Sequence, residues 1–348
     1  MTSQSVVVFG GTGAQAGPIL SIVHPDLSAA GTFKITVPTR NTSSDSAQAL
    51  TRLPNVRLIQ AGYDSEQGLR AAFAGQDACY FIINSFEIRE PDEYFWTMRA
   101  YEIAAQSGLK HFVYSGARNR LKDTGFNEAY RNSHNVVKAH MSDWLQQQSV
   151  ETLPWTIVYG GVYAEMLGSV LCPMKQGEEF IFAAPVHEES IIPLMPLDNY
   201  GTTLAYILQH PTDFLGQFVD AGAIPSTWPE IVSAFVNVTK KNARFQPIAQ
   251  DQWFEGAKKK GMDPDSRLPK TASADDPATF TFRKSFGSWW NMWRDNTREN
   301  ELSGRTKSGD KLFVPGRIAT LSEWMERTGY QGEPKEPTKM RREAASFP

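Results

Sequence analysis

Short apolar runs alternate with helical segments through the first half of the chain. The runs are nearly continuous and rich in β-branched and aromatic residues, which is typical of strands buried on both faces of a sheet. Six of them are predicted to be strands: 5–9, 33–37, 56–59, 78–83, 111–115 and 155–159. Helices are predicted between them, at about 15–23, 44–52, 65–74, 94–107 and 133–148. This alternation predicts an α/β protein with a doubly wound parallel sheet, the Rossmann fold.

The pattern becomes less regular after residue 160, where proline is more frequent. A helix is expected near 201–209, a strand at 217–220 and a helix over 228–240. Residues 263–279 are polar and contain no clear periodicity, so an irregular loop is expected there.

Three regions follow from this change of pattern. Residues 1–160 are expected to form a nucleotide-binding Rossmann domain. Residues 161–330 are expected to form a smaller α/β substrate domain, partly woven back into the sheet. Residues 331–348 are charged and contain proline, which favours a disordered tail.

Charge and cysteine content narrow the classes of protein. Lys and Arg number 35 against 38 Asp and Glu, a formal net charge of -3, so no basic excess supports direct nucleic-acid binding. Two cysteines, Cys79 and Cys172, form no disulfide framework. Signal-peptide and membrane-spanning patterns are not found. These features favour a soluble cytoplasmic protein, with a nuclear location expected only for a regulator.

A glycine cluster follows the first predicted strand, in the stretch VVVFGGTGAQAGPIL at 6–20. Gly10 can make a tight turn and Gly13 can let the backbone approach a pyrophosphate, with the next helix supplying free N–H groups. The alternative is a purely structural turn. Its place on the first strand-to-helix turn of a doubly wound sheet favours a dinucleotide site.

The end of the second strand selects the cofactor. An NAD enzyme usually carries an acidic residue there, which accepts hydrogen bonds from the ribose 2′-OH. The sequence here is VPTRNTSSDS, with Arg40 and no acid before Asp45. A guanidinium at this place would pair with a 2′-phosphate, although a solvated surface arginine is the simpler alternative. The predicted cofactor is therefore NADP(H).

Several of these motifs together resemble the NmrA-like family of the short-chain dehydrogenase/reductase superfamily. They are GGTGAQAG (10–17), the pair Arg40-Asn41, FVYSGARN (112–119), WTIVYGGVYAEML (155–167) and PLMPLDNYGTTLAYIL (193–208). The resemblance covers most of residues 5–250. It implies an NADP-binding fold in which some members are reductases and others are redox-sensing regulators. One departure is Gly62, where members often carry an acid near the adenine.

The glycine turn, the second strand and the resemblance together give a set of expected cofactor-binding residues. They are Gly10, Thr12, Gly13, Ala14, Gln15, Arg40, Asn41, Asn84, Lys138, Gly161 and Tyr163.

The expected catalytic residues are Lys138, His134, Ser115 and Tyr130. Short-chain reductases use a Tyr-x-x-x-Lys pair, and here Lys138 stands in the lysine position while His134 replaces the tyrosine. Their i,i+4 spacing puts both on one helix face. The simpler alternatives are an exposed helix lysine and a helix-start histidine. Ser115 can instead cap the backbone at its strand end, and Tyr130 can be a loop anchor. No metal-ligand spacing and no G-x-S-x-G hydrolase motif is found.

An aromatic stretch at 280–296, FTFRKSFGSWWNMWRDN, lies beyond the resemblance. Phe286, Trp290 and Trp293 repeat at i, i+4 and i+7, so a helix would place them on one stripe, with Trp289 beside it. Burial tendencies favour a core contact for this stripe. The alternative is an aromatic wall over the substrate, and the expected substrate pocket is Tyr163, Trp289, Trp290 and Trp293.

Two functions remain open. The first is an NADP(H)-dependent oxidoreductase acting on a bulky, largely apolar small molecule, with secondary metabolism implied by the family resemblance only. The second is a non-catalytic redox sensor that binds NADP(H) and acts through a protein partner. Loss of the usual tyrosine motivates the second.

Overall fold

The structure is a computed structural model that describes residues 4–12, 33–269, 272–273, 275–298 and 314–335. Its centre is a seven-stranded sheet in the order β3-β2-β1-β4-β5-β6-β11, with every neighbouring pair parallel. The strands are β1 Gln4–Val8, β2 Phe33–Thr39, β3 Val56–Gln60, β4 Ala78–Phe81, β5 His111–Gly116, β6 Trp155–Tyr159 and β11 Gln217–Asp220. The predicted doubly wound α/β fold is confirmed.

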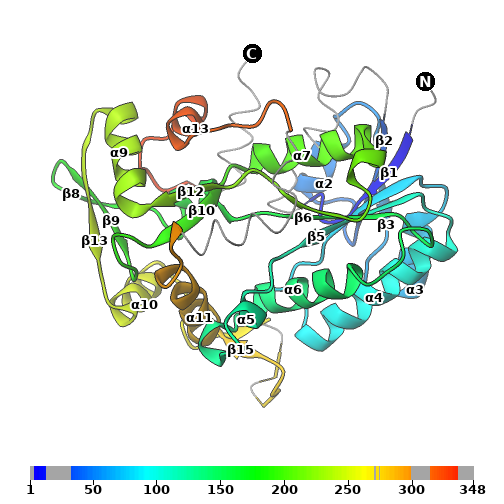
Figure 1. Cartoon of the computed structure of the whole chain (residues 1–348), viewed down its shortest axis with the longest axis horizontal. Helices are drawn as coiled ribbons and strands as arrows, with labels where there is room; N and C mark the ends of the chain where they lie inside the picture. Colours follow the sequence, from blue (N-terminus) through cyan, green and yellow to red (C-terminus); the bar gives the residue numbers. More distant parts are fainter. Residues whose placement is uncertain (1–3, 13–32, 270–271, 274, 299–313, 336–348) are drawn as a thin grey trace.

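Helices cover both faces of this sheet (Figure 1). One face carries α3 Glu66–Phe73, α4 Glu90–Gln106 and α6 Ser133–Leu145, and the other carries α2 Asp45–Leu50 and α7 Leu197–Gln209. Each layer has its own apolar core, because the sheet strands are apolar on both sides. The carboxyl ends of the parallel strands therefore meet along one edge, where open α/β sheets bind ligands.

The six expected strands and most of the expected helices are present within a few residues. Helix α4 starts at Glu90, four residues before the expected start at residue 94, because Pro91 fits the first turn of a helix. Helix α7 likewise begins at Leu197, directly after Pro196. The helix expected at 15–23 lies outside the described residues.

The chain returns to the large sheet after residue 160. Strand β11 pairs in parallel with β6, from Gln217 opposite Thr156 to Asp220 opposite Tyr159. Helix α7 packs on the same body, where Tyr200 and Leu204 lie in a core shared with β1 and β2. The chain beyond residue 160 thus contributes a strand and a helix to the body of the large sheet.

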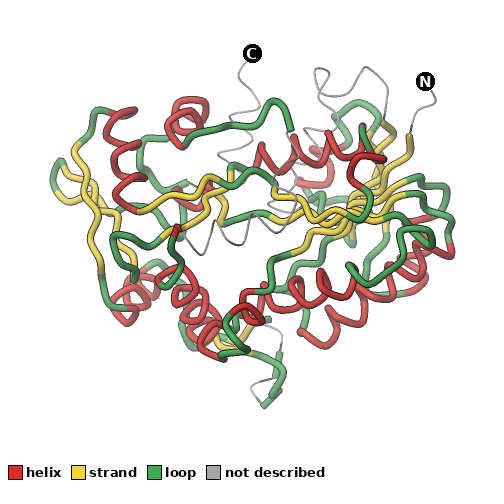
Figure 2. Tube along the Cα trace, viewed as in Figure 1, coloured by secondary structure: helices red, strands yellow, loops and turns green. Residues whose placement is uncertain are grey.

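The remaining elements form a smaller α/β part beside the large sheet (Figure 2). Its two sheets run β12-β10-β7 and β13-β9-β8. The strands are β7 Val162–Tyr163, β8 Met174–Gln176, β9 Glu179–Ala184, β10 Ile191–Met195, β12 Ile224–Thr227 and β13 Asn242–Pro247. The helices are α9 Trp228–Thr239, α10 Gln250–Lys259, α11 Phe282–Arg294 and α13 Leu321–Thr328.

Short elements connect these parts. They are α5 Arg120–Asp123, η1 Glu128–Tyr130, η2 Ala164–Gly168, α8 Pro211–Phe214, β14 Arg267–Leu268 and β15 Phe280–Thr281. Among the described residues of the loop expected at 263–279, the regular element is β14, which pairs with β15 just beyond it. Within the described parts of the chain, every helix is too short or too polar to cross a bilayer.

Candidate functional site

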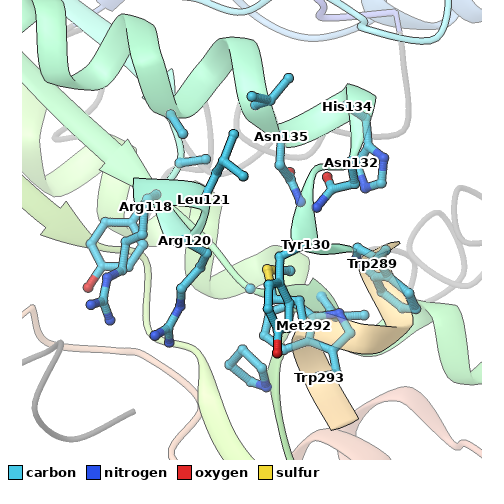
Figure 3. Close-up of a pocket in the computed structure, with 18 of the residues that line it drawn as sticks. Arg118, Arg120, Leu121, Tyr130, Asn132, His134, Asn135, Trp289, Met292 and Trp293 are labelled. Atoms are coloured by element: carbon cyan, nitrogen blue, oxygen red, sulfur yellow. The ribbon is translucent and has the colours of Figure 1, made fainter. Parts of the chain in front are cut away.

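A cavity of about 230 Å³ lies beyond the carboxyl ends of β5 and β6, between α6 and α11 (Figure 3). One wall is apolar and largely aromatic, and it comes mainly from α11 and the segment after β6. The opposite wall carries arginine and asparagine side chains from the segment 117–135. Its aromatic and thioether lining residues are Phe86, Tyr130, Tyr159, Tyr163, Met166, Phe286, Trp289, Met292 and Trp293.

Several residues that line this cavity carry a buried polar side-chain atom that has no hydrogen-bond partner among the described residues. These atoms include Asn132 Oδ1, His134 Nδ1, Arg118 Nη1 and Trp293 Nε1. Buried polar atoms normally find partners, and an unpaired group marks a place where a ligand or water binds. Figure 3 shows the side chains of Asn132 and Asn135 converging at the cavity, with Arg118 and Arg120 pointing to one side.

Lys138 does not face this cavity. Its ammonium donates to the Ile83 carbonyl at 2.9 Å, to Ser85 Oγ at 2.5 Å and to Glu93 Oε1 at 2.6 Å. An ammonium has three donors, so these contacts use all of them. The Glu93 carboxylate is 1% exposed, which makes the pair a buried ion pair between α6 and α4. Lys138 is therefore held by the protein itself.

His134 is stacked between two phenylalanine rings. Its ring centroid lies 5.1 Å from that of Phe86 and 5.5 Å from that of Phe286. Burial, and after it the nearby charge of Lys138, together lower the pKa of His134 to about 3. The imidazole is therefore neutral at physiological pH, so one ring nitrogen can donate and the other can accept a hydrogen bond, and the ring carries no charge into the cavity.

This neutral histidine predicts a pH dependence of stability. Its folded pKa lies below the unfolded value of 6.5, so protonation favours the unfolded state and stability is lost as the pH falls below 6.5. We expect His134→Phe to reduce the stability difference between pH 7.5 and pH 5 by about 2 kcal/mol. Urea unfolding at the two pH values measures this. His111, whose pKa burial lowers to about 4, keeps part of the dependence in the variant. An unchanged difference would contradict a buried neutral His134.

Ser115 and Tyr130 lie at different places. Ser115 is buried and accepts a hydrogen bond from Tyr200 Oη at 2.8 Å, which ties β5 to α7 rather than facing the cavity. Tyr130 lines the cavity, but its hydroxyl donates to Asp295 Oδ2 at 2.9 Å. That bond fixes η1 to the end of α11. Of the four expected catalytic residues, only His134 and Tyr130 contact the cavity.

The described part of the glycine turn has the expected geometry. Gly10 has φ +70°, and a Cβ at this position would lie 2.8 Å from Ile82 Cγ2, so only glycine fits without strain. Thr12 is half-buried at the end of the described segment. The other expected residues of the turn, Gly13, Ala14 and Gln15, lie outside the described residues.

Arg40 and Asn41 follow β2 directly. The Asn41 backbone N–H donates to Thr39 Oγ1 at 3.3 Å, and its side-chain oxygen accepts from the Ser43 N–H at 2.9 Å. Asn41 thus shapes the turn that presents Arg40. The Arg40 side chain is 63% exposed and pairs with Glu87, an acid from the loop after β4. An exposed guanidinium of this kind can form charge-assisted hydrogen bonds with a phosphate.

Asn84 lies beside the same pair, because its Nδ2 donates to Glu87 Oε1 at 3.0 Å. Gly161 and Tyr163 line the cavity after β6. A Cβ at Gly161 would lie 2.0 Å from the Pro193 carbonyl oxygen, so this strand end packs too closely for any side chain. Of the expected cofactor residues, Arg40 and Asn84 therefore meet at Glu87, whereas Gly161 and Tyr163 lie at the cavity.

The aromatic stripe divides between two surroundings. Trp289 and Trp293 line the cavity, together with Met292 and Phe286. Trp290 does not: it is 0% exposed and packs edge-on against Trp253 at 5.3 Å. Trp290 is a core residue of the smaller part. Of the four residues expected in the substrate pocket, it is the one that does not line the cavity.

Sequence reasoning missed several residues of the site. Glu93 pairs with Lys138 and Glu87 pairs with Arg40, although each acid is more than 40 residues from its partner. Asn132 directly precedes the helix that carries His134, and no motif marked it. Within the described segments no group of His, Cys, Asp and Glu is arranged to hold a metal ion.

This chain is similar in sequence and in fold to known proteins. The NmrA-like oxidoreductase hkm9 of Aspergillus hancockii is 26% identical over 277 residues, 73% of this chain and 78% of that protein. The structure of the negative transcriptional regulator NmrA in complex with NADP superposes with a TM-score of 0.56 at 15% identity, covering 89% of this chain and 99% of NmrA. Triphenylmethane reductase of Citrobacter sp., complexed with NADP(H), gives 0.60 at 16% identity, covering 91% and 98%.

These structures share the NAD(P)-binding fold, and the named relative is an oxidoreductase. The family profile of the NmrA-like family matches residues 2–261, well over half of the chain. The resemblance inferred from the motifs is thereby confirmed: the chain belongs to the NmrA-like family.

Proposed function

We propose that the protein is an NADP(H)-dependent oxidoreductase that acts on a bulky, largely apolar small molecule, such as a secondary metabolite. The observation that carries this proposal is the cavity at the carboxyl ends of β5 and β6, with its wall of Trp289, Met292 and Trp293. Ligand sites in proteins are typically apolar clefts with a few placed polar groups at this edge of the sheet.

NADP(H) is the cofactor that the sheet edge fits best. Gly10 would allow the pyrophosphate to approach, Arg40 and Asn84 would hold the adenosine end, and Gly161 and Tyr163 would border the nicotinamide. When bound, the nicotinamide supplies or accepts the hydride. The fully partnered ammonium of Lys138 would fix the positions of α6 and the loop after β4, rather than carry a proton.

The polar atoms of the cavity favour an oxygen-bearing substrate. Trp293 Nε1 and Arg118 Nη1 are donors, and Asn132 Oδ1 is an acceptor. A flat molecule with carbonyl and hydroxyl oxygens would satisfy these atoms while its rings pack on α11. The neutral imidazole of His134 and the hydroxyl of Tyr130 are the two proposed hydrogen-bond partners for the reacting oxygen.

NADPH oxidation with flat carbonyl, quinone and cationic dye probes tests the activity. We expect turnover of at least one probe, and a higher KM for Trp293→Phe because that change removes an indole N–H from the cavity wall. Trp324→Phe, a buried tryptophan in α13 away from the cavity, is the matched control. Tight NADPH binding without oxidation by any probe would count against an oxidoreductase.

The cofactor assignment has its own test. We expect Arg40→Glu to weaken NADPH binding about 10–100-fold, since it removes a charge-assisted contact with the 2′-phosphate, and to change NADH binding little. Calorimetry measures both. Arg244→Glu is a matched control, because Arg244 is also an exposed arginine paired with a glutamate, in the smaller part. Equal losses for NADPH and NADH would mean that Arg40 does not discriminate between them.

A redox sensor is the second candidate. Two observations favour it: a neutral His134 stands where reductases carry tyrosine, and the structural neighbour NmrA is described as a negative transcriptional regulator. A pull-down with and without NADPH separates the two functions. Capture of a protein partner that depends on NADPH would support the sensor, and capture that ignores the cofactor would oppose it.

A further inference from the structure

The Glu87 carboxylate accepts hydrogen bonds from Arg40 and Asn84, the two side chains that are expected at the adenosine end of the cofactor. Glu87 Oε2 accepts from Arg40 Nη2 at 2.5 Å, and Glu87 Oε1 accepts from Asn84 Nδ2 at 3.0 Å. The two oxygens of the carboxylate thus accept from a guanidinium directly after β2 and from an amide in the loop after β4. A cofactor that uses Arg40 must therefore compete with Glu87.

The loop backbone fixes Glu87 in this place. Its N–H donates to the Asn84 carbonyl at 2.9 Å, and the Phe86 N–H donates to Asn84 Oδ1 at 3.1 Å. The side chains themselves are 44% exposed for Glu87 and 63% for Arg40. Exposed ion pairs contribute little to stability, so the pair can open without cost to the fold. The turn therefore keeps the Glu87 carboxylate close to Arg40, and the exposed side chain can still rotate into solvent.

The charge of the ligand decides how this carboxylate acts. A phosphate monoester carries a charge of about -2 at pH 7. If it shared one guanidinium with a carboxylate, the two anions would repel each other. A ribose 2′-OH is neutral and can donate a hydrogen bond to the carboxylate. Glu87 therefore opposes NADPH binding and tolerates NADH, whereas Arg40 favours NADPH.

We propose that Glu87 is a specificity-determining residue that lowers the affinity for NADP(H) and narrows its preference over NAD(H), by competing with the 2′-phosphate for Arg40. This rests on the proposed use of Arg40 as the 2′-phosphate ligand. Asp64 also interacts electrostatically with Arg40. The guanidinium donates its hydrogen bond to Glu87, however, so Glu87 is the direct competitor.

Binding of adenosine 2′,5′-bisphosphate and of 5′-AMP tests the proposal without any turnover. The two probes differ only in the 2′-phosphate. Calorimetry would compare the wild-type chain with Glu87→Gln, Arg40→Gln and the double variant. We expect Glu87→Gln to bind the bisphosphate about 5–10-fold more tightly and AMP within about twofold. The gain should disappear in the Arg40→Gln background, and NADP⁺ should follow the bisphosphate.

Glu179→Gln is the matched control. Glu179 is 42% exposed and pairs with Arg244 at 3.2 Å, so its removal changes the net charge equally. It lies on β9, at the opposite end of the molecule from β2 and β3 (Figure 1). Equal bisphosphate affinities for Glu87→Gln and Glu179→Gln would overturn the proposal, as would a gain that persists without Arg40. If Arg40→Gln itself leaves both probes unchanged, the proposed cofactor site fails instead, and the proposal falls with it.

Discussion

Lys138→Met is expected to lower the free energy of unfolding by about 3–5 kcal/mol, because it leaves the carboxylate of Glu93 buried without its cation. Glu93 is 1% exposed, and its Oε1 accepts from both Lys138 Nζ and Ser85 Oγ. Its Oε2 has no partner among the described residues. An uncompensated charge in that position costs far more than the loss of an exposed pair.

A double-mutant cycle tests this reading of Lys138. The double variant Lys138→Met with Glu93→Gln should recover most of the loss, since it removes both charges and keeps similar volumes. Urea unfolding of the two single variants and the double variant gives the coupling energy. A double variant as unstable as the sum of the singles would show that the two groups are independent and would contradict a stabilising ion pair between them.

The position of Lys138 could be predicted from the sequence, but its partners could not. The i,i+4 spacing to His134 placed both residues on α6, and the structure agrees. Two of its three partners come from the loop after β4 and the third from the first turn of α4, 45 to 55 residues away in the chain. No local pattern links residues at that separation, because sheet order and helix packing bring them together.

The same limit applies to Arg40. The strand pattern predicted where β2 ends and therefore where the guanidinium lies. The loop after β4 became a neighbour only through the strand order, since β4 and β2 both flank β1. Parallel strands that are adjacent in space are separated in sequence by their crossovers, so an acid such as Glu87 carries no signal that it faces Arg40.

The aromatic stretch shows which features of a helix its sequence periodicity can predict. It predicted a helix with an aromatic stripe, and α11 spans Phe282–Arg294 as expected. Periodicity could not say which of two stripes faces the cavity, because this helix is covered on most of its sides. Phe286, Trp289 and Trp293, at i, i+3 and i+7, face the cavity, while Trp290 points into the core.

The different surroundings of Trp290 and Trp293 predict that substitution of Trp290 lowers stability, whereas substitution of Trp293 affects ligand binding. Trp290→Ala should destabilise the protein by about 3–5 kcal/mol, because it empties a fully buried site that touches Trp253 and Trp289. Trp290→Phe should cost much less. The indole Nε1 of Trp290 has no acceptor among the described residues, so its removal relieves an unpaired N–H and offsets part of the lost packing.

Trp293→Phe separates stability from ligand binding at the cavity. Trp293 is 8% exposed and keeps its ring contact with Trp289, so phenylalanine should retain most of the packing while losing the unpaired indole N–H of a residue that lines the cavity. Thermal and urea unfolding would be measured for all three variants, with quenching of tryptophan fluorescence by an aromatic ketone as the binding assay. A stable Trp290→Ala that loses only ligand binding would move Trp290 into the cavity wall, because a fully buried indole cannot be removed from a packed core without a large loss of stability.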